Sequence, residues 1–391
     1  MTLQLVKTAA EEAYGGTTLP HARMEDWKWT NLRTLVDRPY PPRQRVEAKP
    51  ADVERLVKAS PFASIAATRM VFVNGRFDAA HSKLANGKAG ARAASDEPVM
   101  AMNGAFADDG ANLMLSGTAD TPVELVFVTT SGAPRTVASR NVIEVAAGAS
   151  ATIIETHLGE GGYLSNSVTE IRLGEGARLD RVKVEHEAGE AIHLAHAHVT
   201  LAKGATLRDF TLTSGARVNR QNGTYAFTGQ GGDVKVTGAY LLGGRQHADT
   251  KLEVDHRVPH CTSRELFKCV MDDEARGIFQ GKVIVRPDAQ KTDGKQSSHA
   301  LLLSERAEFD AKPELEIFAD DVVCGHGATS GDLNHDHVFY LKSRGIPEAE
   351  AKSLLIAAFV GEAFDAISHD GIREALVAFA EGWLVSHKGR R

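Results

Sequence analysis

The stretch Ile143-Glu-Val-Ala-Ala-Gly-Ala149 recurs as Ile171-Arg-Leu-Gly-Glu-Gly-Ala177 and again as Val199-Thr-Leu-Ala-Lys-Gly-Ala205. The glycines at 148, 176 and 204 stand 28 residues apart, and Gly232 follows after a further 28. A fixed period of this length is typical of a solenoid, in which one repeat cannot bury its own apolar face. Because apolar residues alternate before each glycine, each repeat is predicted to be a β coil with a glycine corner of positive φ. The alternative is a β-sandwich whose loops share this spacing by coincidence.

The regions on either side of the repeats are predicted to be largely helical. Residues 24–37 and 53–59 have helix-like apolar spacing, whereas Met70–Val73 with Asn74-Gly75 indicates a strand that enters a tight turn. After Gly345 we expect two amphipathic helices that cap an end of the solenoid or bind a partner. Their apolar stripes are Ala351, Leu354, Leu355, Ala358 and Phe359 in the first, and Ile372, Ala375, Leu376, Phe379 and Trp383 in the second.

The expected domain organisation follows from these patterns. Residues 1–115 form a mixed, largely helical region, residues 116–344 a parallel β-helix core, and residues 345–391 a C-terminal helical region. The predicted fold class is therefore mainly β, with a solenoid flanked by helices.

Composition limits the class of protein further. The 391 residues carry a net charge of −6, which argues against broad binding to nucleic acid. Three cysteines are an odd number in a long chain, which argues against a disulfide framework and fits a reducing compartment. No signal-peptide pattern is present at the N-terminus, and no apolar run approaches the ~20 residues that span a bilayer. We expect a cytoplasmic protein that binds neither nucleic acid nor a membrane.

The usual catalytic and metal motifs are missing from the sequence. It has no phosphate-binding loop Gly-x4-Gly-Lys-Ser/Thr, no Gly-x-Ser-x-Gly elbow, no Cys-x-x-Cys and no His-Glu-x-x-His. Two clusters of reactive side chains remain as candidates.

The first cluster is His193, His196 and His198. In a strand His196 and His198 point to one face and His193 to the other. Two imidazoles on one face could hold a transition metal, but no carboxylate or thiol stands nearby at ligand spacing. Polar surface is therefore the favoured interpretation.

The second cluster is Cys324-Gly-His326, whose thiol and imidazole share a strand face. An imidazole can activate a thiol as the thiolate, and both groups can ligate iron. For an isolated pair of this kind, a buried cysteine near a structural histidine is the better interpretation. Of the other cysteines, Cys269 is expected in the core and Cys261 is undecided.

A series of motifs occurs in order along most of the chain: Met24-Glu-Asp-Trp-Lys-Trp-Thr30, Val73-Asn-Gly-Arg-Phe77, Arg257–Lys268, Gly277-Ile-Phe-Gln-Gly281, Gln290–Gln296, Cys324-Gly-His-Gly-Ala-Thr329 and His337–Ile346. Together they resemble the SufB/SufD family of iron–sulfur cluster assembly proteins. The resemblance implies a right-handed parallel β-helix, which agrees with the 28-residue period. It also implies a non-catalytic scaffold in a complex with two partners, a SufB subunit and the ATPase SufC.

Departures from the SufB pattern favour the SufD branch of the family. SufB chains carry a cysteine on the strand that corresponds to Ser297–Ala300, and many have a cysteine cluster near the N-terminus, whereas the first cysteine here is Cys261. In the SufD branch, the residues that match Cys324 and His326 lie at the SufB interface and take part in building the cluster. The resemblance therefore overrides the structural interpretation of this pair and implies that both residues are transient metal ligands.

The resemblance also gives candidate contacts and cofactors. SufC is expected on the C-terminal helical region, with candidate contacts at Tyr340, Arg344, Ile346, Leu354 and Phe359. No cofactor is expected to bind tightly; a transient iron–sulfur cluster at the SufB interface and reduced flavin in the complex are the candidates. Without SufB, the isolated chain is expected to form a homodimer through the same strands.

Two other functions stay open at this point. A β-helix enzyme such as a carbohydrate lyase would line a coil face with acids, yet the acidic pair Asp320 and Asp321 points to opposite strand faces. An iron- or flavin-binding module that acts alone is the third possibility.

Overall fold

The computed structural model describes residues 19–42, 46–84 and 97–388. Its helices are η1 (Glu25–Trp27, a 3-10 turn), α2 (Leu32–Leu35), α3 (Pro50–Lys58), α4 (Pro98–Phe106), α5 (His335–Ser343), α6 (Glu348–Gly361) and α7 (Asp370–Lys388). Its strands are β1 (Thr68–Val73), β2 (Arg76–Phe77), β3 (Asn112–Leu115), β4 (Val123–Thr129), β5 (Thr136–Val145), β6 (Ser150–Gly159), β7 (Leu164–Leu173), β8 (Arg178–His186), β9 (Ile192–Leu201), β10 (Thr206–Thr213), β11 (Val218–Phe227), β12 (Asp233–Leu242), β13 (His247–His256), β14 (Thr262–Met271), β15 (Arg276–Val285), β16 (Asp293–Leu302), β17 (Glu308–Ile317) and β18 (Val323–Gly331).

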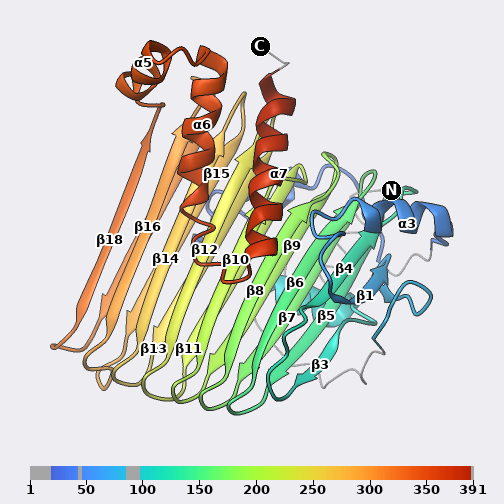
Figure 1. The fold of residues 1–391 in the computed structure, drawn as a ribbon. Coiled ribbons are helices and arrows are strands. Elements are labelled where there is room, and N and C mark those ends of the chain that lie inside the picture. Colours follow the sequence, from blue (N-terminus) through green and yellow to red (C-terminus); the bar gives the residue numbers. More distant parts are fainter. Residues whose placement is uncertain (1–18, 43–45, 85–96, 389–391) are drawn as a thin grey trace.

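Two long sheets form the walls of a parallel solenoid (Figure 1). Sheet A has ten strands in the order β18-β16-β14-β12-β10-β8-β6-β4-β1-β2, and sheet B has eight in the order β17-β15-β13-β11-β9-β7-β5-β3. The chain alternates between the two sheets from β3 onward, so each strand pairs in parallel with the strand two positions later. Within the described ranges only β1 and β2 pair antiparallel. The mainly β, parallel solenoid predicted from the sequence is confirmed.

The lumen between the two sheets holds the main hydrophobic core. Ile143, Ile171 and Val199 stack in register on β5, β7 and β9, and each is at most 1% exposed. These residues stand five positions before the repeating glycines. The 28-residue period therefore places equivalent side chains one above another in the lumen, where they exclude water.

The repeating glycines occupy equivalent corners, as predicted. Gly148, Gly176 and Gly204 have φ of +69°, +64° and +65°, which a side chain at Cβ would strain. The expected fourth corner at Gly232 is wrong by one residue, because the positive φ of +73° belongs to Gly231. In the next two coils His260 and Lys291 take the left-handed corner, so the corner does not strictly require glycine.

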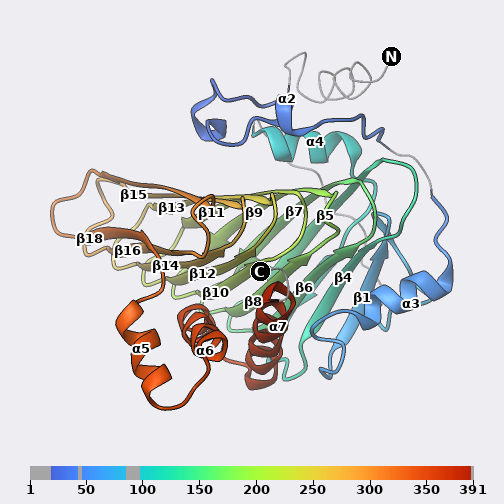
Figure 2. The same cartoon turned by 90° about the horizontal axis from the view of Figure 1, so that it is seen from above.

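The two C-terminal helices lie along the outer face of sheet A, so neither covers the end of the solenoid (Figures 1 and 2). Outward residues such as Val184 on β8, Phe210 on β10 and Leu241 on β12 pack against Ile356 and Leu376. The apolar stripe that the sequence predicts for the last helix is confirmed in α7. In α6 the buried face is centred on Ile356 and Val360, whereas Leu354 and Ala358 are exposed.

The N-terminal segments cover other outer faces of the solenoid. Around α2 and α4, Leu32 and Val99 pack on sheet B, while Val53 of α3 packs on the β1 and β4 end of sheet A (Figure 2). The helix expected over residues 24–37 is wrong, since only the short η1 and α2 form there and Trp27, rather than Trp29, is buried. The turn at Asn74-Gly75 and the helix near 53–59 are present.

Strands β1 and β3 join the solenoid sheets from the N-terminal region, and α5 begins at His335 within the expected core. The boundaries after residues 115 and 344 remain predictions.

In the part of the chain that the structure describes, no helix is both long and apolar enough to cross a membrane.

Candidate functional site

Cys324 and His326 lie on β18, the last strand of sheet A. In register, β16 places Gly294 beside Cys324 and Gln296 beside His326. Cys324 contacts the lumen cluster formed by Val283, Val285 and their neighbours, so its side chain points inward. His326, two positions along the same strand, shares that inward face. The structure therefore places both side chains at the end of the lumen, with His326 exposed to solvent.

The surroundings of Cys324 favour the neutral thiol. Burial raises the pKa of this thiol, and Asp293 adds to the shift. No hydrogen bond joins the thiol to the imidazole of His326, and burial leaves the thiol neutral in the isolated chain. A Cβ at Gly294 would lie 3.6 Å from the Cys324 sulfur, which is ordinary van der Waals contact.

The end of the solenoid that carries this pair is open. Strand β17 is the edge of sheet B and β18 the edge of sheet A, and both leave one side of their backbone unpaired. Large apolar side chains are exposed beside these edges, at 42% for Ile317, 59% for Phe318 and 61% for Val323. Two long edge strands with unpaired backbone groups, and with exposed apolar side chains where β17 ends and β18 begins, are a template for pairing with another chain.

The three histidines separate as predicted, but two of them are buried rather than part of a polar surface. His193 points into the lumen, where its two ring nitrogens lie 2.8 Å from Glu185 and 2.6 Å from Glu187. Although burial opposes the charged imidazolium, these carboxylates raise the pKa of His193 to about 9. Sequence spacing showed no carboxylate near His193, because Glu185 and Glu187 belong to the preceding strand and loop.

His193 is part of a buried ion network that the sequence analysis missed. Arg181 bridges Glu155 at 2.8 Å and Asp209 at 3.0 Å, and Lys183 lies 2.5 Å from Glu185. Burial alone would raise the pKa of Glu155, but Arg181 holds that pKa well below its ordinary value. The sequence contains a pattern that predicts this network. Every second residue after the core residue Leu179 is charged (Arg181, Lys183 and Glu185), so these side chains point to the same face of the strand as Leu179.

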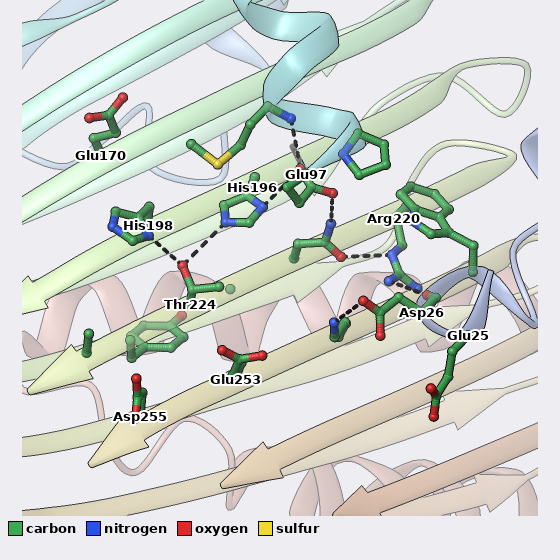
Figure 3. Close-up of a pocket in the computed structure, with 18 of the residues that line it drawn as sticks. Glu25, Asp26, Glu97, Glu170, His196, His198, Arg220, Thr224, Glu253 and Asp255 are labelled. Carbon is green, nitrogen blue, oxygen red and sulfur yellow. Dashed lines mark hydrogen bonds and ion pairs between the residues drawn. The ribbon is translucent and has the colours of Figure 1, made fainter. Parts of the chain in front are cut away.

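His196 and His198 lie on the opposite, outer face of sheet B, in a cleft of about 710 Å³ (Figure 3). The Thr224 hydroxyl contacts His198 at 2.7 Å and His196 at 3.4 Å. Glu97, from the start of α4, lies 3.3 Å from the other nitrogen of His196. Burial lowers the pKa of His198.

The charges around this cleft are largely paired. Arg220 bridges Asp249 and the backbone carbonyl of Asp26, while Lys251 lies 2.6 Å from the Asp26 carboxylate. Over residues 19–42, 46–84 and 97–386, no group of three or more His, Cys, Asp or Glu side chains is arranged to hold a metal ion. The cleft therefore offers hydrogen bonds and apolar walls, and its ionic groups mainly hold the N-terminal segment on sheet B.

The predicted SufC contacts fall on α5, on α6 and on the turn between them, which holds Arg344 and Ile346. Tyr340 is 56% exposed and Leu354 48%, whereas Phe359 packs inward under Lys268, whose ammonium lies 4.7 Å from the ring centre. Arg344 is exposed and donates to the Tyr340 hydroxyl at 3.2 Å, and Ile346 is half-buried. Phe339 on α5, which no sequence pattern singled out, is 73% exposed. Of the remaining cysteines, Cys269 is in the core as expected, and Cys261 is also fully buried.

Comparison with known proteins identifies relatives of this chain. Residues 127–359 match the family model for the SufBD core domain of the SUF system of FeS cluster assembly. The chain is 29% identical to the iron–sulfur cluster assembly protein SufD of Escherichia coli, over 93% of this chain and 88% of that protein. It is 30% identical to an iron–sulfur cluster assembly SufBD family protein of Synechocystis, over 92% of this chain and 86% of that one. A SufBD family protein of Mycobacterium leprae is 35% identical over 51% of this chain and 53% of its own length.

Proposed function

This chain belongs to the SufBD family, and we propose that it is a non-catalytic scaffold subunit for the assembly of iron–sulfur clusters. In this proposal it acts in the manner of the SufD branch, pairs with a SufB-type subunit and binds a SufC-type ATPase. The absence of a phosphate-binding loop from the sequence agrees with ATP hydrolysis by a partner.

The observation that carries the proposal is the open end formed by β17 and β18. The opposite end of the solenoid finishes in short strands, since β2 has two residues and β3 has four. At the open end the edge strands have ten and nine residues and expose apolar side chains. A second β-solenoid could continue both sheets there and cover these groups.

The inward face of this end supports a role in cluster building. Iron and sulfide are cargo in this reaction, and Cys324 and His326 offer them one thiol and one imidazole. Because the thiol is held neutral, its proton must leave when iron binds. A partner seated on the open end would have to supply the remaining ligands. The proposal includes no tightly bound cofactor, and reduced flavin in the complex remains a prediction.

Charged substitutions at the open end test the pairing. The double substitution Phe318→Lys and Val323→Lys is expected to weaken binding of the SufB-type subunit by about tenfold or more, because buried apolar anchors dominate such interfaces. Met114→Lys is the matched control, since Met114 is 77% exposed on β3 at the other end. Binding is measured by titration calorimetry with the purified partner. Equal losses in both variants, or none in the double variant, would rule out the open end. The same double substitution is expected to weaken the predicted homodimer of the isolated chain, as measured by light scattering.

A separate substitution tests the ATPase contact. Leu354→Asp is expected to lower affinity for the SufC-type subunit by about tenfold or more, by placing a charge in the exposed part of α6. Val385→Asp, at a position that is 67% exposed on α7, is the control. Deleting the helices would be a poor test, because it would expose the outer face of sheet A that α6 and α7 cover. Unchanged affinity for Leu354→Asp in a pull-down titration would place the ATPase elsewhere.

A further inference from the structure

The cleft on the outer face of sheet B contains two histidines that the proposed function does not use. His196 and His198 alternate along β9, so both side chains leave the strand on one face. Figure 3 shows the two imidazoles directed at the hydroxyl of Thr224, on the neighbouring strand β11. The hydroxyl oxygen lies 2.7 Å from Nδ1 of His198 and 3.4 Å from Nε2 of His196. One nitrogen of each ring therefore converges on the same point of the cleft.

A carboxylate faces the other nitrogen of His196. Glu97 lies 3.3 Å from Nδ1 of this ring. Because a carboxylate can only accept hydrogen bonds, it favours the tautomer with the proton on Nδ1 and a lone pair on Nε2. Glu97 is itself held in place, since it accepts from the backbone N–H of Met100 and from the side-chain amide of Asn222, both at 2.8 Å. Histidines that bind metal ions usually have a partner of this kind behind the ring.

The ring of His198 can present a lone pair to the same point. Among the described residues, its Nε2 has no hydrogen-bond partner, so the ring proton can reside there and leave Nδ1 as an acceptor. The Thr224 hydroxyl has one proton to donate and cannot satisfy a lone pair on each ring. A metal ion bound by both nitrogens satisfies the two lone pairs together.

The carboxylates around the two rings favour a cation over an anion. Glu253 on β13 stands beside Thr224 in register, and no described residue forms a hydrogen bond or an ion pair with it. It therefore adds a negative charge next to the point on which the rings converge. Glu170 on β7 stands beside His198, but Arg140 already binds it. The cleft of about 710 Å³ gives an ion access to the rings from solvent.

We propose that His196 and His198 chelate a divalent transition-metal ion through Nε2 and Nδ1, in exchange for their contacts with Thr224. Imidazole suits ions such as Zn²⁺, Ni²⁺ and Cu²⁺, which it binds at about 2.0–2.1 Å. Since the hydroxyl occupies the point of convergence, the Thr224 side chain turns aside when the ion enters.

The proposed site is open and separate from the end of the solenoid. No third histidine, cysteine or carboxylate is in place to complete it in the part of the chain whose side chains the structure describes, so water fills the remaining positions. A further ligand can replace that water. The site lies on β9, whereas Cys324 and His326 lie on β18, so the inference does not depend on the proposed function.

The test is a titration of the full chain with Cu²⁺, followed by electron paramagnetic resonance. A Cys324→Ser background removes the half-buried thiol, which could itself bind or reduce copper. We expect the bound ion to show coupling to the nitrogens of two imidazoles. His196→Asn and His198→Asn should each weaken its binding by about tenfold or more, because each removes a ligand.

The matched control is a second pair with the same spacing in the sequence. His335 and His337 are both exposed on α5, where residues two apart do not face each other. His337→Asn should therefore leave the affinity for Cu²⁺ unchanged. An equal loss in His337→Asn, or unchanged affinity in either cleft variant, would overturn the proposal.

Two readouts protect the test against a folding defect in the histidine variants. The coupling pattern is measured in the background chain, which keeps both ligands, and coupling to fewer than two imidazoles would contradict the chelate. Thr224→Ala removes the hydroxyl but neither ligand, so it should keep the affinity for Cu²⁺ or raise it. Loss of binding in Thr224→Ala would show that the hydroxyl, rather than the histidine pair, holds the ion.

Discussion

A complex assembled with the His326→Ala chain is expected to form with normal stoichiometry but to contain about tenfold less iron and acid-labile sulfide, or lower still, given the usual cost of changing groups around a metal. The physical reason is that His326 is exposed at the open end, so its loss leaves no cavity in the core. Among the described residues of β18, it is the imidazole that shares an inward face with Cys324. The measurement is iron and sulfide content of the purified complex, beside a size-exclusion profile.

Cys324→Ser provides the comparison within the same site. Serine has nearly the same volume, so the complex should again assemble, but the loss of cluster should be smaller because the partner can supply a thiol. Wild-type cluster content in the His326→Ala complex would return this pair to a structural role. Failure of the complex to assemble would show that His326 serves packing at the interface.

Arg181→Met is expected to lower the free energy of unfolding by about 3–5 kcal/mol, because it leaves buried carboxylates without their counter-charge. The Arg181 side chain is 4% exposed and pairs with Glu155 and Asp209, which are 0% and 2% exposed. Methionine fills much of the space but neutralises neither carboxylate. Urea denaturation followed by circular dichroism measures the effect, and failure of the variant to fold would agree with it.

The control for Arg181 lies on the next strand of sheet A. Arg208 on β10 pairs with Asp233 at 3.0 Å, but the two side chains are 23% and 39% exposed. Solvent screens such a pair, so Arg208→Met should cost less than about 1 kcal/mol. Equal stability losses in the two variants would mean that the buried ion network of the lumen stabilises the fold no more than an exposed ion pair does.

The sequence determined the repeating part of the fold because a solenoid is nearly one-dimensional. Each coil contacts its neighbours at a fixed separation along the chain, so the spacing of Gly148, Gly176 and Gly204 records the geometry directly. The apolar stripe of α7 and the inward parity of Cys324 and His326 also follow from local periodicity. The same reasoning separated His193 from His196 and His198.

Only the tertiary structure decided what each of these faces meets. Strand parity does not tell which face is the lumen, so His193 could not be assigned to a buried ion network from spacing alone. In α6 the register of the buried face was set by packing on β14, which left Leu354 exposed. The cleft joins Asp26 to Lys251, which lie far apart in the sequence. Such contacts depend on which strands become neighbours and on what covers them, and a local pattern of residues carries neither piece of information.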